Sequence, residues 1–412
     1  MVAMGIIRRA LRVAVGALLA VGCTGSPHAR LTAAPTNREL VKVLASGSTV
    51  PPPPAPPQPW SEVGEVNFLD AGFGWAPVVQ SCSDASCVSV FVSDNGGERW
   101  WRRTGSPIVV AEPESPSIHP RPMVRLATKD IGWLIDWAGR LFSTTDGAVT
   151  FHPEPTSGAV IDLQAHGEQV WRLDKSCDPQ GSCQVSLMTS SDYGRTWAVG
   201  HPPAIGRTGA SFAWPSAQAG YILSDRGDST IDAARPDPVL TRTLDGGKTW
   251  TTSAPPCSGY DNGSGYEGSG SGGWDLAASS PSDLWLVCQD TPASGAMQPK
   301  HLYRSSDGGA SWSQDLGTPN AGAGGHTVAA SPARACRGGS RTSIACTHDG
   351  GRTWFYPVPQ ANPDDGGVDV YQFVDELHGW AIGQDPDTGA ISALWHTADG
   401  GDSWSRQHVT TP

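Results

Sequence analysis

The stretch Thr243–Trp250 reads TLDGGKTW, and variants of this eight-residue motif occur at six other places in the 412-residue chain. The two glycines can adopt the positive φ angles of a tight turn, and the Asp carboxylate can accept hydrogen bonds from the amides of that turn. The Trp supplies a large ring for burial against a sheet. The motif therefore predicts a recurring tight turn between two strands. The other copies read SDNGGERW at Ser93, TTDGAVTF at Thr144, SSDYGRTW at Ser190, SSDGGASW at Ser305, THDGGRTW at Thr347 and TADGGDSW at Thr397.

The spacing of the motifs predicts the architecture. Successive copies begin 51, 46, 53, 62, 42 and 50 residues apart, which leaves room for four short strands, A to D, in each unit. The chain has 50 Gly and 35 Pro, whereas helices disfavour both residues. We therefore predict an all-β, seven-bladed β-propeller with the motif between strands C and D of each blade. The predicted blades span roughly 62–103, 123–155, 160–199, 209–254, 273–316, 324–358 and 367–408.

A second pattern lies upstream of most motifs, on the strand that we assign as B. The pattern is an aromatic residue, often preceded by Gly. We expect this residue to be buried in the packing between neighbouring blades. The sixth unit lacks this aromatic and reads Arg334–Gly338 instead. The aromatic residues are Trp75, Trp133, Trp171, Tyr221, Trp285 and Trp380.

The N-terminal 61 residues predict export. Three arginines accompany a short apolar stretch that ends in Leu19–Cys23 (LAVGC), which resembles a bacterial lipobox. We predict a lipoprotein signal peptide at 1–22, lipid attachment at Cys23, a Pro-rich stalk at 23–61 and the propeller at 62–412. The predicted location is the cell membrane, facing outside the cytoplasm. The alternative is an ordinary signal peptide in which Cys23 is incidental.

The repeated motif resembles the Asp-box, or BNR, repeats of bacterial sialidases, sortilin-type receptors and xyloglucan-cleaving hydrolases. The photosystem II stability/assembly factor family is the most similar in plan, with a signal peptide and seven blades carrying Gly-Trp strands and DGGxTW turns. The resemblance implies the propeller fold, whereas propellers serve binding, assembly and catalysis alike.

The cysteines fit an oxidising compartment. Nine Cys less the lipidated Cys23 leave eight, which can pair completely. Three close pairs would each join strands B and C of one blade, and a fourth would join a long loop to strand B of the fifth blade. The predicted disulfides are Cys82–Cys87, Cys177–Cys183, Cys257–Cys288 and Cys336–Cys346.

The polar residues of the motifs are assigned to folding, and no catalytic residue is predicted. Tyr266 and Glu267 are the residue types of the nucleophile pair of sialidases, but the match goes no further than residue type. Arg121 does not lie in the sequence context of a sialidase arginine motif. We expect neither a metal nor a cofactor, because no cysteine pair has C-x-x-C spacing and the histidines are scattered. The structural motif residues are Asn95, Asp146, Asp192, Asp245, Asp307, Asp349 and Asp399.

The sequence favours a non-enzymatic, lipid-anchored propeller that binds or helps to assemble a partner outside the cytoplasm. A formal charge of −12 without basic runs argues against nucleic acid. We predict that an envelope protein or glycan docks on the face formed by the B–C and D–A loops, since these are the long ones. The alternatives are a secreted sialidase-type glycoside hydrolase and a purely structural envelope protein. The long loops are Thr104–Pro122, Gly227–Pro238, Pro255–Gly272 and Gln289–Lys300.

Overall fold

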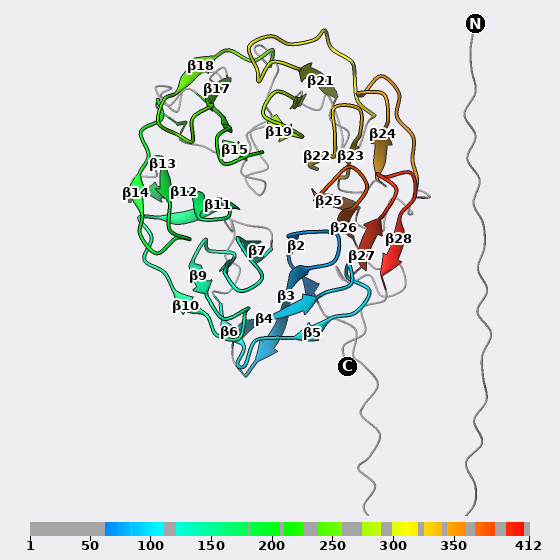
Figure 1. Ribbon diagram of the computed structural model, residues 1–412. Coiled ribbons are helices and arrows are strands. Elements are labelled where there is room, and N and C mark those ends of the chain that lie inside the picture. The colour runs from blue at the N-terminus through cyan, green and yellow to red at the C-terminus, as the bar shows by residue number, and fades with distance from the viewer. Residues whose placement is uncertain are drawn as a thin grey trace, which may run out of the picture. The chain divides into compact units, whose positions relative to one another are not determined.

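Seven antiparallel sheets stand around a central channel in the compact unit Pro56–Pro412 (Figure 1). The computed structural model describes residues 62–407, apart from 84, 111–120, 180–181, 204, 207–209, 226–237, 258–273, 290–298, 320–324, 340–343, 359–366 and 384–392. The predicted seven-bladed propeller is confirmed. The predicted signal peptide, lipidated Cys23 and stalk lie outside the described residues. Among the described residues there is no helix long and apolar enough to cross a membrane.

Blades 1 to 4 follow one another along the chain, and each has its A strand next to the channel. Blade 1 differs in having an interrupted A strand, β1 and β2, and a sixth strand that pairs with β4. The strands are β1 Glu62–Val63, β2 Asn67–Phe68, β3 Gly74–Cys82, β4 Ala85–Ser93, β5 Trp101–Arg102, β6 Ile108–Val109, β7 Met123–Leu126, β8 Gly132–Ile135, β9 Leu141–Thr144, β10 His152–Pro153, β11 Ala159–His166, β12 Gln169–Cys177, β13 Cys183–Ser190, β14 Ala198–Val199, β15 Ala210–Ala213, β16 Gly220–Asp225, β17 Pro238–Thr243 and β18 Thr251–Ser253.

Blades 5 and 6 have three strands each within the described residues, where the sequence predicts four. In blade 5 the side chain of Asp315 accepts the amide of Leu302, so a regular outer ladder does not form. In blade 6 only Phe355 pairs with strand C, and Pro357 soon follows without an N–H to donate. The remaining strands are β19 Trp274–Ala278, β20 Leu284–Gln289, β21 Lys300–Ser305, β22 Thr327–Ala329, β23 Ala335–Arg337, β24 Ala345–Thr347, β25 Val368–Phe373, β26 Gly379–Gly383, β27 Ala393–Thr397 and β28 Ser405–Gln407.

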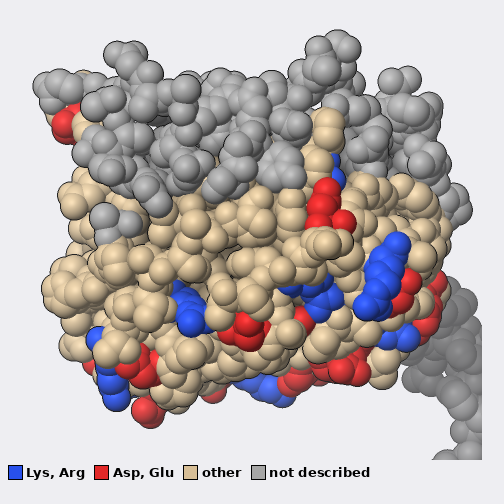
Figure 2. All heavy atoms as spheres, turned by 90° about the horizontal axis from the view of Figure 1, so that it is seen from above, with Lys and Arg blue, Asp and Glu red and all other residues tan. Residues whose placement is uncertain are grey.

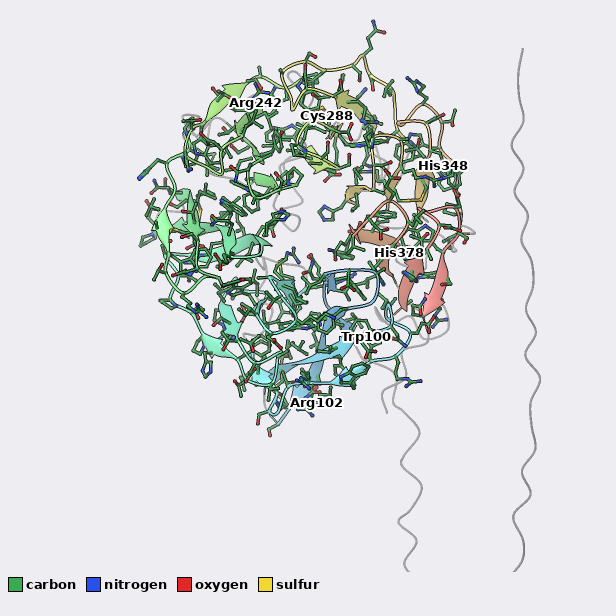
Figure 3. All side chains as sticks on the ribbon, viewed as in Figure 1. Trp100, Arg102, Arg242, Cys288, His348 and His378 are labelled. Carbon is green, nitrogen blue, oxygen red and sulfur yellow. A yellow bond between two sulfur atoms is a disulfide. The ribbon has the colours of Figure 1, made fainter. Side chains whose placement is uncertain are left out.

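The aromatic residue of strand B packs against the Asp-box turn of the next blade. Trp285 of blade 5, for example, lies against Gly351 of blade 6, where an added Cβ would be 3.4 Å from the ring. Such contacts form the seam between neighbouring blades, and side chains fill this space (Figure 3). The predicted role of the second pattern is thus seen in six seams. The contacts are Trp75 with Phe151, Trp133 with Gly194, Tyr221 with Gly308, Trp285 with Gly351 and Trp380 with Gly96. In the seam between blades 3 and 4, Trp171 stacks on Trp214, whose ring in turn contacts Trp250 of the Asp box.

In the seam between blades 6 and 7, a disulfide takes the position of the missing aromatic. Cys336 of strand B and Cys346 of strand C are fully buried. A Cβ added to Gly401 of the next Asp box would lie 2.5 Å from the Cys336 sulfur and 2.8 Å from the Cys346 sulfur. The disulfide therefore fills the place that Trp285 fills one seam earlier.

Within residues 62–407 as described, the first and last blades exchange no strand. Every sheet consists of strands from one continuous segment. The rings of Phe68 and Trp380 stack with centroids 3.7 Å apart, and the Trp380 indole donates to the Gly96 carbonyl at 3.0 Å. Side-chain packing therefore closes the ring.

Candidate binding site in the central channel

Side-chain amides connect the A strands around part of the channel wall. The Gln372 carbonyl oxygen accepts the Phe68 amide at 2.8 Å, while its NH2 group donates to the Phe68 carbonyl at 2.8 Å. Asn67 accepts the amide of Leu126 at 2.9 Å. These contacts join blade 7 to blade 1 and blade 1 to blade 2.

Blades 3, 4 and 5 are joined in a similar way. Gln164 donates to the Phe212 carbonyl at 2.8 Å and accepts the Trp214 amide at 2.8 Å. The His166 Nε2 atom also contacts the Trp214 carbonyl. Ser211 donates its hydroxyl to the Trp274 carbonyl at 3.3 Å. The wall is thereby held in one arrangement before any ligand arrives.

Three charged residues span blades 1, 2 and 3. The Arg125 guanidinium lies 3.2 Å from Glu65 and 3.3 Å from Asp162, with all three side chains at most a quarter exposed. Burial alone would lower the pKa of Arg125, but the charges on Asp162 and Glu65 raise it. Two carboxylates thus share one permanently charged cation.

A second charged group spans blades 5, 6 and 7. Arg337 is fully buried and donates to Asp275 at 3.0 Å and to Thr327 at 2.7 Å. The imidazole of His326 lies 3.8 Å from Asp275 and 3.9 Å from Asp369. Burial would lower the pKa of His326, but Asp369 and Asp275 raise it to about 10, so the ring is cationic at neutral pH.

Burial perturbs two further groups near this wall. It lowers the pKa of Lys300 to about 7, assisted by the charge on Arg337. It also raises the pKa of Tyr371, whose hydroxyl accepts a hydrogen bond from Arg121 at 3.2 Å. Arg121, which the sequence places outside any sialidase motif, thus contacts a tyrosine of blade 7.

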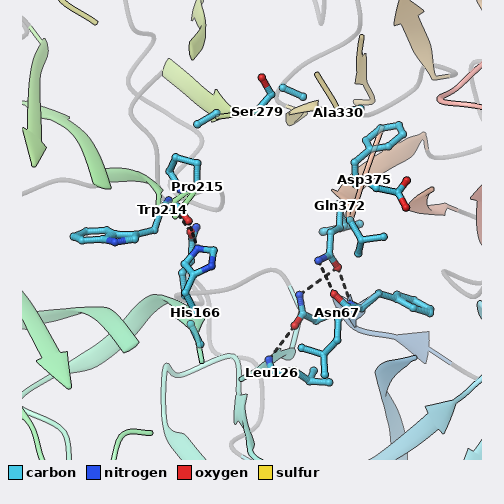
Figure 4. A pocket seen from close by; sticks show the side chains of 18 of the residues that line it. Asn67, Leu126, His166, Trp214, Pro215, Ser279, Ala330, Gln372 and Asp375 are labelled. Carbon is cyan, nitrogen blue, oxygen red and sulfur yellow. Dashed lines mark hydrogen bonds between the residues drawn. The ribbon is translucent and has the colours of Figure 1, made fainter. Parts of the chain in front are cut away.

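A cavity of about 930 Å³ occupies the channel and is lined by Glu65 and Arg125 of the first charged group and by the amides of Asn67, Gln164 and Gln372, but not by the second charged group. In Figure 4, Asn67 and Gln372 lie on one side of the opening, and His166 and Trp214 lie on the other. The lining combines polar side chains with apolar ones that range in size from Ala330 to Trp214. A volume of this size is typical of sites for small molecules or short peptide segments.

The Asp-box residues form local hydrogen bonds in their turns. Asp245 accepts the amide of Thr249 at 2.9 Å and its hydroxyl at 2.6 Å, while the Thr243 hydroxyl accepts the Gly247 amide at 2.8 Å. The bonds from Thr249 lower the pKa of Asp245 to about 2. Gly246 and Gly247 have φ angles of 76° and 94°, as the turn requires. Equivalent acceptors are Asn95, Asp146, Asp192, Asp307, Asp349 and Asp399.

The eight described cysteines occupy the four predicted pairs. Three pairs join strands B and C of one blade, and the fourth joins Cys257 to strand B of blade 5. Their Cα–Cα distances are 5.8 Å for Cys82–Cys87, 3.9 Å for Cys177–Cys183, 5.4 Å for Cys257–Cys288 and 4.1 Å for Cys336–Cys346.

Several predicted features lie wholly or largely outside the described residues. These are Cys23, the pair Tyr266 and Glu267, and most of the four long loops on the B–C/D–A face. Within the described part of the chain, no group of three His, Cys, Asp or Glu side chains is arranged to hold a metal ion.

The polar residues of the channel wall were not predicted from the sequence. One available signal was the alternation in strand A: in β25, Asp369 and Tyr371 alternate with the buried Val368 and Val370. The partners of these residues come from other blades. Local spacing therefore does not reveal the charged groups.

Comparisons with known proteins support the fold. Neither a family model nor a curated protein matches the sequence. Among solved structures, YCF48 bound to D1 peptide has a TM-score of 0.53 at 15% identity, covering 83% of this chain and 95% of that chain. YCF48 from Cyanidioschyzon merolae has a TM-score of 0.52 at 13% identity, covering 84% and 98%. A polysaccharide lyase of family PL25, an ulvan lyase with bound saccharide, has a TM-score of 0.51 at 9% identity, covering 86% and 100%.

The predicted likeness to photosystem II assembly factors is confirmed at the level of structure, since YCF48 is such a factor. Identities of 9 to 15% show a shared fold. The same fold carries a peptide in one of these structures and a saccharide in another. The choice between binding and catalysis therefore rests on the residues of this chain.

Proposed function

We propose that this chain is an exported, lipid-anchored propeller that binds a protein or glycan of the cell envelope without catalysing a reaction. The observation that carries the proposal is the channel wall, whose buried charges are paired with one another. Asp275 and Asp369 contact His326, and Glu65 contacts Arg125. Carboxylates held in such pairs stabilise a scaffold, and this favours binding over hydrolysis.

The similarity in fold to YCF48 bound to D1 peptide supports a protein partner. We propose docking on the B–C/D–A face, because long loops on one face of a rigid scaffold commonly form binding sites. The first test shortens Pro255–Gly272 and, in a separate variant, replaces Asp307 and Asp349 with Ala. Loop shortening should abolish capture of envelope partners by crosslinking in native membranes and leave thermal stability nearly unchanged. The Asp-box changes should lower thermal stability before they affect the capture of a partner.

Partner capture that survives loop shortening would refute docking on this face. Sialidase activity in the purified protein that is lost in Tyr266→Phe or Glu267→Gln would refute the non-enzymatic assignment and favour the hydrolase.

The proposed anchor has a separate test. The segment before Cys23 has the positive charge, apolar length and small-residue exit that lipoprotein processing needs. Intact-mass analysis of membrane-extracted protein should find an acylated N-terminal Cys23. A Cys23→Ala variant that remains at the membrane would contradict lipid anchoring.

A further inference from the structure

The cavity lies at the end of the channel where the A strands pass into the A–B turns, and the B–C and D–A connections leave from the opposite ends of the strands. Its rim consists of the last A-strand residues and the A–B turns, and these turns share a face with the Asp boxes. One or more residues of every A–B turn contribute to it. They include Leu69, Ala127, Gly167, Pro215, Ser279, Ala330 and Val374.

The charges that line this cavity are predominantly negative. Glu65, Asp375 and Glu376 contribute three carboxylates, and Arg125 contributes the one guanidinium among the lining residues. Arg125 is already engaged by Glu65 and by Asp162 behind it. Asp375 lies 2.9 Å from the Nδ1 atom of His378, which is outside the lining, and the lining itself holds more carboxylates than cations.

The Asp375 carboxylate at the rim accepts hydrogen bonds from the backbone of its own turn. Burial would raise the pKa of Asp375, but the backbone amides of His378 and Leu377 lower it below its ordinary value. Glu376 is exposed on the same turn. Figure 2 shows that charged side chains of the described residues gather along one side of the disc when it is seen edge-on.

The wall is also fixed in advance. The amides of Asn67, Gln164 and Gln372 bond neighbouring A strands, so a ligand would not have to order them. Preorganisation of this kind lowers the free-energy cost of binding.

We propose that this cavity binds a segment of a protein partner that carries lysine or arginine, and that the segment enters from the Asp-box side. Charge complementarity selects a cation, and about 930 Å³ accommodates a few residues. This site is separate from the docking face on the B–C/D–A loops. A partner could therefore contact the propeller from both sides.

The test measures binding of three capped hexapeptides to the full chain by calorimetry at about 0.15 M salt, where long-range charge effects are screened. The peptides are hexalysine, hexaglutamate and an uncharged Gly-Ser sequence. Hexalysine should bind more tightly than the other two. Glu376→Gln should weaken its binding about fivefold, since a charge pair at close range in water contributes about 1 kcal/mol. Glu376→Lys should weaken it further.

Glu98→Gln is the matched control, because Glu98 is an exposed carboxylate of the blade 1 Asp box outside the cavity lining. It should leave hexalysine binding unchanged. The proposal is overturned if hexalysine binds no more tightly than hexaglutamate, or if Glu98→Gln weakens binding as much as Glu376→Gln. Neither result depends on the loops that test the proposed function.

Discussion

Two neighbouring seams, between blades 5 and 6 and between blades 6 and 7, are packed with different side chains at the same position. In the first, Trp285 of strand B and Leu302 of strand C cover Gly351 of the next Asp box. In the second, Cys336 and Cys346 occupy the corresponding strands and cover Gly401.

The comparison shows what the repeat requires at this position. It requires apolar volume from strands B and C that presses on a glycine of the following turn, and either an aromatic-leucine pair or a disulfide can provide it. The disulfide has less volume than Trp and Leu together, but it adds a covalent constraint on the unfolded chain. The seams should therefore respond differently to substitution.

The largest effect should come from Trp285→Ala. The indole is fully buried, so its removal leaves a cavity and should lower the free energy of unfolding by about 3–5 kcal/mol. Chemical denaturation followed by circular dichroism measures this. If Trp285→Ala lowers the free energy of unfolding by less than removal of the disulfide in the next seam does, Trp285 does not stabilise its seam more than the disulfide stabilises its own.

The second effect concerns the disulfide itself. Cys336→Ala combined with Cys346→Ala should lower the free energy of unfolding by about 2–4 kcal/mol, because both the cross-link and the sulfur packing are lost. Cys82→Ala with Cys87→Ala is the control, since that bridge lies at the end of a hairpin rather than in a seam. Equal losses in the two double variants would mean that the seam packing of the sulfurs contributes little.

A thermodynamic cycle isolates the contact with the glycine. Gly401→Ala introduces a Cβ at 2.5 Å from the Cys336 sulfur and at a φ angle of 93°. The backbone strain is the same in either background, but the steric clash should disappear when both cysteines are alanine. The coupling between the two changes should be about 1 kcal/mol or more. Additive effects would argue that the sulfurs do not press on this turn.

The smallest net effect is the pH dependence of the parent protein, in which two opposing trends involve both seams, because His326 of blade 6 contacts blades 5 and 7. Folding raises the pKa of His326 from 6.5 to about 10, so its stabilising contribution falls as pH rises through that interval. Folding lowers the pKa of Lys300 from 10.5 to about 7, so the destabilising effect of its buried charge disappears as pH rises from 7. The two trends oppose each other.

Measurements of thermal stability from pH 7 to 10 separate them. Relative to the parent protein, His326→Gln should gain stability as pH rises, and Lys300→Met should lose it. Parallel profiles for all three proteins would show that these two groups do not titrate as the geometry indicates.

The sequence predicted the blade number and the disulfide pairs because both depend on local spacing. The Asp boxes mark the C–D turns, and Cys177 and Cys183 face each other across one hairpin. It did not predict that Cys336 replaces an aromatic, because that role appears only when Gly401 of another blade is brought near. Nor did it predict the channel charges, since Arg337 and Asp275 lie 62 residues apart.

The closure of the ring has a consequence for how the chain can be rearranged. Among the described strands, each sheet comes from one continuous segment, so every seam is a contact between two such segments. A circular permutant that joins the present ends of the propeller and opens the connection between His152–Pro153 and Ala159–His166 would keep all seven sheets intact. Insertion of one additional whole unit at such a connection would likewise leave the existing sheets uncut. The connections between blades are therefore the places where the chain can be cut without breaking a sheet.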